Sequence, residues 1–284
     1  MVDETKQIDN CTLLKQAFDF IEEIAPKIIK DDLENQSFII NPDDPNEHKP
    51  EWHQFGIITH TKWVLFHYEN TMQKYLKKWG VDKNVDTYLD AKIDGMSRKR
   101  LLGLSIPFHD VGKFPGRYFK VRDGQKVPYY NDHEKLSEKL INENDDFQLF
   151  FKALGLTFLQ IDYIAKCAGL HYELGKIRDI IRSKRQSLFN IAFTKSQSCK
   201  DFCVDCMVKN PIFTVEIGVL YLCDSLAKTD IILDVETDEE VLSKSNEVDE
   251  IVTRRVLHPN LVNTIKQLPA NIALARTYME LIPY

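Results

Sequence analysis

The sequence predicts an all-α helical bundle that carries one β-hairpin. Apolar residues recur at three- and four-residue steps over most of the chain, as they do on one face of a helix. A single segment, 118–127, instead alternates as two short strands around Asp123-Gly124, which is typical of a hairpin. The 284 residues are 43% hydrophobic and 28% charged, an ordinary composition for a globular protein with a full core. We therefore expect one domain over residues 1–284.

The expected elements follow the chain in order. The first is an amphipathic helix whose apolar face comprises Leu13, Leu14, Phe18, Ile21, Ile24 and Ile28. Residues 35–52, rich in Asn, Asp and Pro, predict an ordered loop or extended lead-in. Helices are then expected at about 55–79, 98–110, 133–142, 161–170 and 211–233, the last with Asn210 as N-cap and Pro211 in its first turn. The core should span about 50–233, with the first helix and lead-in at 1–49 and further helices at 234–284.

Composition narrows the class of protein. The net charge of −6 gives no reason to expect nonspecific nucleic-acid binding. The strongest apolar run, 212–223, contains Glu216 and is too short to cross a bilayer. The first residues do not have the pattern of a signal peptide, and six cysteines without such a signal indicate reduced thiols. We expect a soluble, cytoplasmic protein with no membrane partner.

One short stretch is strongly basic. It contains Lys176, Arg178, Arg182, Lys184 and Arg185. Such a run is either a solvated surface or a rim that attracts phosphate groups to a nearby site, and the sequence leaves both interpretations open.

Four histidines and two aspartates are candidate metal ligands. In chain order they are His60, His109, Asp110, His133, His171 and Asp224. Their wide spacing excludes a local zinc knuckle or an EF-hand loop, whereas the core of a helical bundle can bring such residues together. Imidazole and carboxylate ligands suit divalent ions that promote hydrolysis, because a carboxylate can bridge two ions. The other histidines, His48, His53, His67 and His258, fit ordinary core or surface positions.

The series resembles the HD-domain superfamily of metal-dependent phosphohydrolases over about residues 50–230. The segment 108–113 (Phe-His-Asp-Val-Gly-Lys) is similar to the signature, and the matching segments around it are 51–61, 131–134, 169–172 and 222–227. The entry segment 51–61 is similar to the HD domain of some bacterial tRNA nucleotidyltransferases, without implying their transferase activity.

The resemblance implies roles for individual residues. His60, His109, Asp110 and Asp224 would hold one ion, and Asp110 would bridge to a second held by His133 and His171. Tyr172 departs from the pattern, since some binuclear relatives have a second histidine there. Lys113 and Arg117 would contact phosphate oxygens beside the catalytic Asp110, and Glu134 would orient a ligand. The cofactor would be one or two divalent ions, with Mn, Fe, Mg, Co, Ni and Zn not distinguished.

The expected function is hydrolysis of a phosphoester in a nucleotide or a nucleic-acid end. The expected partner is a small phosphorylated substrate; a longer nucleic acid is not favoured, and the oligomeric state is not predicted. Two alternatives remain: a di-iron oxygenase with the same fold, and a metal-stabilised module that binds or senses a nucleotide without turnover.

Three cysteines form a separate cluster, Cys199, Cys203 and Cys206. They could bind a structural zinc if Cys167 or Cys223 supplied a fourth ligand, or they could be reduced thiols on an inserted loop. Both interpretations stay open, and neither involves catalysis.

Overall fold

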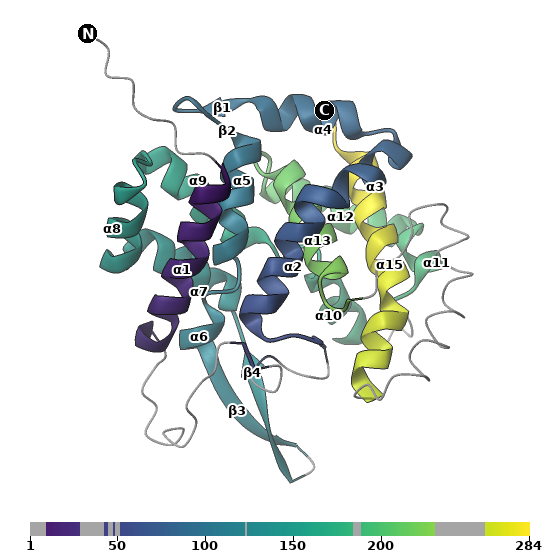
Figure 1. The fold of residues 1–284 in the computed structure, drawn as a ribbon. Helices are drawn as coiled ribbons and strands as arrows, with labels where there is room; N and C mark the ends of the chain where they lie inside the picture. The colour runs from purple at the N-terminus through teal and green to yellow at the C-terminus, as the bar shows by residue number, and fades with distance from the viewer. Residues whose placement is uncertain are drawn as a thin grey trace.

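Helices dominate the computed structural model of the chain, which describes residues 10–28, 43–44, 48, 52–122, 124–183, 189–230 and 259–284 (Figure 1). The predicted all-α architecture with a β-hairpin is confirmed. The helices are α1 (Asn10–Ile28), α2 (Ile57–Asn70), α3 (Met72–Trp79), α4 (Asp82–Asp90), α5 (Arg98–Ser105), the 3-10 helix η2 (Ile106–Phe108), α6 (Lys113–Gly116), α7 (His133–Glu143), α8 (Asp145–Ala153), α9 (Phe158–Leu170), α10 (Lys176–Ser183), α11 (Ile191–Thr194), α12 (Gln197–Lys209), α13 (Thr214–Leu226) and α15 (Pro259–Leu281). Most of the lead-in 35–52 and all of residues 231–258 lie outside the described residues.

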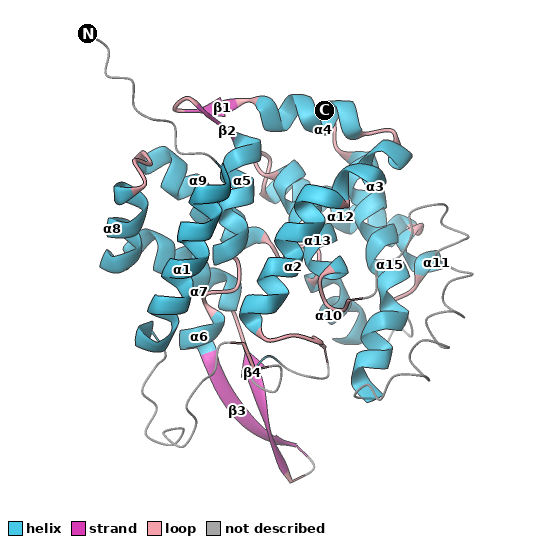
Figure 2. Cartoon of the chain, in the orientation of Figure 1, coloured by secondary structure: helices cyan, strands magenta, loops and turns pink. Residues whose placement is uncertain are grey.

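The predicted hairpin consists of β3 (Arg117–Arg122) and β4 (Gln125–Tyr130), which project from the helical body (Figure 2). The strands are antiparallel, and Arg117 pairs with Tyr130 at the end nearest the bundle. Gly124 has φ +77°, a left-handed conformation that glycine adopts without strain. A shorter hairpin of β1 (Lys92–Ile93) and β2 (Met96–Ser97) was not predicted, although its turn, Asp94-Gly95, is the same dipeptide signal.

Two predicted helices are shorter than expected. The helix expected over 55–79 is interrupted at Thr71, which separates α2 from α3. The helix expected over 98–110 ends at Ser105, because Pro107 has no N–H to donate to the carbonyl one turn back. The chain continues through η2 instead, so His109 and Asp110 lie in a turn after the helix.

The expected start of the helix at 211–233 is also wrong. Asn210 ends α12, and its amide donates to the carbonyls of Cys206 and Met207. The next helix, α13, begins at Thr214, so Asn210 is a C-terminal cap rather than an N-cap.

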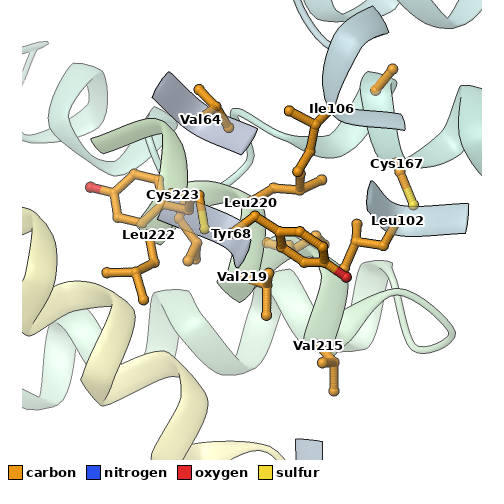
Figure 3. Packing of buried hydrophobic residues seen from close by; sticks show 14 of the residues in the cluster. Val64, Tyr68, Leu102, Ile106, Cys167, Val215, Val219, Leu220, Leu222 and Cys223 are labelled. Carbon is orange, nitrogen blue, oxygen red and sulfur yellow. The ribbon is translucent and has the colours of Figure 1, made fainter. Parts of the chain in front are cut away.

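Helix α13 is the centre of the core. Every residue from Thr214 to Leu226 is buried, as expected for a helix surrounded by others on all sides. Figure 3 shows Val64 and Tyr68 of α2 and Leu102 of α5 beside the apolar side chains of α13. Because α13 also carries Asp224, this packing fixes one end of the candidate site.

Within the described part of the chain, no helix combines the length and the hydrophobicity that a membrane span requires.

Candidate metal centre

The six predicted ligands come from five separate parts of the chain, and all but His133 are buried. His60 lies on α2, Asp224 on α13, and His109 with Asp110 in the turn after η2. The other two are His133, the first residue of α7, and His171, which follows α9. The fold thus brings together candidate ligands that lie between residues 60 and 224 of the sequence.

Asp110 lies between two pairs of histidines. Its Oδ2 is 3.8 Å from Nε2 of His60 and 3.4 Å from Nε2 of His109. Its Oδ1 is 3.3 Å from Nε2 of His133 and 3.7 Å from Nε2 of His171. Each pair with its Asp110 oxygen forms a group whose atoms all lie within 4.8 Å of one another. One carboxylate therefore serves two groups, which is the arrangement a bridging ligand needs.

All four histidines are oriented in the same way, by a hydrogen bond from Nδ1 to a backbone carbonyl. The acceptors are Ala227 for His60 (3.2 Å), Ile106 for His109 (2.7 Å), Tyr130 for His133 (3.1 Å) and Ala168 for His171 (2.7 Å). This bond fixes the tautomer and leaves the lone pair on Nε2, as at metal-ligating histidines.

Asp224 extends the group formed by His60, His109 and Asp110. Its Oδ1 lies 3.0 Å from Nε2 of His60. It is not among the atoms that lie within 4.8 Å of one another in that group. Asp224 therefore joins this group through its contact with His60.

The His-Asp turn is attached to α7 through its backbone. The Gly112 amide donates to Oγ of Ser137 (2.9 Å), and that hydroxyl donates to the carbonyl of His109 (2.8 Å). A Cβ at Gly112 would lie 2.0 Å from the carbonyl oxygen of His133, so only glycine fits. This close approach brings the two histidine groups together.

The donor set fits a divalent cation. Nε2 of His109 and Oδ1 of Asp110 are both buried and have no hydrogen-bond partner among the described residues. A buried polar atom without a partner is costly unless something else satisfies it. Imidazole nitrogens with carboxylate oxygens are suitable ligands for Mn, Fe, Co, Ni or Zn.

Burial disfavours a charge on His109, but the neighbouring Asp110 outweighs it and raises the pKa of that imidazole. Elsewhere in the centre the electrostatics favour neutral His60 and His171 and charged carboxylates. Burial, together with the neighbouring His109, lowers the pKa of His171 to about 3. Burial disfavours a charge on Asp110, but Lys113 and His109 outweigh it and hold the pKa of that carboxyl well below its usual range. These are the protonation states that bind cations.

Two buried lysines accompany the two aspartates. Nζ of Lys113 lies 2.6 Å from Oδ2 of Asp110, and Nζ of Lys228 lies 3.4 Å from Oδ2 of Asp224. Burial lowers the pKa of Lys228 to about 8. Lys113 thus contacts Asp110, and its contact with a phosphate oxygen stays a prediction. Lys228 was not predicted, although its position one turn after Asp224 on the same face could have suggested it.

Arg117 and Glu134 were both expected to assist the centre. The Arg117 guanidinium is 4.9 Å from the ring centroid of Phe119, so a phosphate contact by Arg117 stays a prediction. Oε2 of Glu134 is 3.5 Å from Nδ1 of His133, but that nitrogen already donates to the carbonyl of Tyr130, so an orienting role for Glu134 stays a prediction. From the basic run, Arg178 is buried; the side chains of Arg182, Lys184 and Arg185 lie outside the described residues.

Two histidines expected at ordinary core or surface positions, His48 and His53, lie beside the centre. Nε2 of His48 is 2.8 Å from Nζ of Lys113, and the two imidazole rings stack at 3.9 Å. The His53 ring centroid lies 4.7 Å from that of His60. Both precede α2 in a segment without helical periodicity, so no pattern in the sequence indicated the direction of their side chains.

The three clustered cysteines lie on one helix rather than on an inserted loop. Cys199, Cys203 and Cys206 are buried on α12. Among the described residues they do not form a group of three ligand atoms close enough for one ion. The structural-zinc interpretation thus gains no support from the described residues, and the alternative of reduced thiols stays a prediction.

A scan against protein-family models and searches of curated proteins and solved structures found no match to this chain. The buried histidine and aspartate groups, which could bind metal, are the strongest indication of function.

Proposed function

We propose that this protein is a metal-dependent phosphohydrolase of the HD type that cleaves a phosphoester in a nucleotide or a nucleic-acid end. The observation that carries the proposal is the position of Asp110, with one carboxylate oxygen toward each histidine pair. The order of motifs in the sequence supports the same conclusion.

Each group has a part in the proposed reaction. His60, His109, Asp110 and Asp224 would hold one ion, and Asp110, His133 and His171 a second. Such ions lower the pKa of a water molecule and neutralise phosphate oxygens. The buried Lys113 ammonium would contact a nonbridging phosphate oxygen as a compact charge, and its burial would strengthen that contact.

The charges around the centre favour a small anionic substrate. Lys113, Lys228 and Arg178 are each less than one-tenth exposed, at 6%, 7% and 7%. When Asp110 and Asp224 bind metal ions, the positive charges of Lys113 and Lys228 lose much of their compensation. A phosphate group would restore it, because buried charges are stable only when they are paired.

The test is phosphate or nucleoside release from a panel of cyclic, mono-, di- and triphosphate nucleotides with added manganese. Asp110→Ala protein serves as the control, with metal content and helicity measured beside it. Turnover that disappears in the variant while helicity remains is the expected result.

Absence of turnover on every substrate would contradict the proposal. Iron content and oxygen uptake would then test the di-iron oxygenase, whose His and Asp ligands would be the same. Tight nucleotide binding without product would instead indicate a sensing module.

A further inference from the structure

His48 joins the segment before α2 to the metal centre. Its ring is fully buried, with Nδ1 2.8 Å from the carbonyl oxygen of Phe55 and Nε2 2.8 Å from Nζ of Lys113. The carbonyl can only accept, so Nδ1 carries the proton. Nε2 therefore accepts a hydrogen bond from the Lys113 ammonium.

The Lys113 ammonium has two fixed partners. It donates to Oδ2 of Asp110 at 2.6 Å and to Nε2 of His48 at 2.8 Å. An ammonium has three hydrogens, so one remains for a substrate oxygen. If Asp110 binds a cation, its attraction for the ammonium weakens. His48 is then the partner that keeps Lys113 in place.

Two described residues on either side of His48, Asp43 and Gln54, contact the neighbouring helical segments. Both carboxylate oxygens of Asp43 accept hydrogen bonds from Thr59 at the start of α2, at 2.7 and 2.8 Å. The Gln54 amide donates to the carbonyl of Lys228 (2.9 Å), just after α13. The His48 ring itself is fixed by the carbonyl of Phe55, by Nζ of Lys113 and by stacking on His53.

We propose that His48 is a positioning residue that holds the Lys113 ammonium toward the phosphate group of the substrate. The inference rests on the proposed function, since it requires a phosphate at the metal centre. It gives the segment before α2 a part in substrate binding.

Two substitutions separate this role from simple packing. Gln in place of His48 puts its terminal polar group near the position of Nε2 and can still reach Lys113. Asn reaches only the position of Nδ1, so it can keep the bond to Phe55 but not the bond to Lys113. His67→Asn, at a buried histidine of α2 that contacts none of the proposed ligands in the described structure, controls for loss of a buried imidazole.

The measurement is the affinity of manganese-loaded protein for inorganic phosphate by calorimetry, with nucleotide turnover measured in parallel. His48→Asn should weaken phosphate binding about 10-fold, the scale found for residues that orient a functional group. His48→Gln should restore most of that loss, and His67→Asn should show no such loss. Metal content and melting temperature, measured for each variant, show whether the centre is intact.

A double-mutant cycle with Lys113→Ala decides whether His48 acts through the lysine. In the Lys113→Ala background, His48→Asn should change phosphate affinity less than about 2-fold, because the contact is already lost. Equal losses in both backgrounds, equal losses in the Gln and Asn variants, or no phosphate binding by the wild type would each overturn the inference. Phosphate binding that follows the predicted pattern without turnover on any nucleotide would support His48 and contradict the hydrolase.

Discussion

The Nε2 atoms of His133 and His171 lie 3.3 Å apart, although the residues belong to different helical segments. Both Nδ1 atoms donate to backbone carbonyls, so in the neutral rings both Nε2 atoms have lone pairs. Two lone pairs at this distance repel each other unless a cation or a shared proton lies between them. A metal ion bound by both Nε2 atoms would remove this repulsion.

The first prediction follows from this pair. His133→Ala should remove one bound ion per chain and leave the group of His60, His109 and Asp110 loaded. Asp110→Ala should remove both ions, because it belongs to both groups. Elemental analysis of desalted protein gives the ratio. A wild-type chain that binds a single ion, retained in His133→Ala, would show that the second group is not a metal site.

The second prediction concerns Glu216, a buried carboxylate in the first turn of α13. Its Oε1 accepts from Oη of Tyr163 (2.7 Å) and from Arg98 (3.1 Å). Arg98→Met would leave this carboxylate buried without its cation, which typically costs about 3–5 kcal/mol. Urea unfolding of Arg98→Met should show that loss. The double variant with Glu216→Gln should recover part of it; no recovery would mean that the effect arises elsewhere.

The elements that the sequence predicted best are those with a strong local signal. The 3.6-residue periodicity identified α1, and Asp123-Gly124 identified the β3–β4 hairpin. Helix ends were less predictable, because they depend on single residues: Pro107 ends α5 early, and Asn210 closes α12 instead of opening α13. The same Asp-Gly signal at Asp94 was overlooked.

For the candidate metal centre, the residues that meet in the two buried groups were predictable from their order in the chain, but their hydrogen-bond partners were not. The bond between His48 and Lys113 links residues 65 positions apart, and no periodicity encodes it. Likewise, the carbonyls that orient the histidines are supplied by the backbone, so they leave no trace in residue type.

The third prediction is that the buried His67 makes the stability of the protein depend on pH. Burial lowers its pKa from 6.5 to about 4. Between these values the unfolded chain binds a proton that the folded protein does not, so stability falls as pH falls from about 6.5 to 4. The loss from this residue is at most about 3 kcal/mol. His67→Gln should therefore reduce the slope of melting temperature against pH in metal-free protein. An unchanged slope would exclude His67 as a source.

The fourth prediction separates the cysteines from catalysis. Cys203 is fully buried among apolar side chains, and serine would place a hydroxyl there at a cost of about 1–3 kcal/mol. Cys203→Ser should lower the melting temperature and leave kcat and bound metal unchanged. Loss of one equivalent of zinc in this variant would restore the structural-zinc hypothesis.

The packing of α13 against α2 has a consequence for biosynthesis. Residues 109–171 supply four of the six ligands, so these emerge from the ribosome well before Asp224. His60 emerges earlier still, but Asp224 can meet it only after α13 has been synthesised and has joined the core. The proposed ligand set is thus complete only in a chain in which α13 has been synthesised and has packed against α2. A truncated product lacking α13 would lack Asp224 and carry an incomplete ligand set.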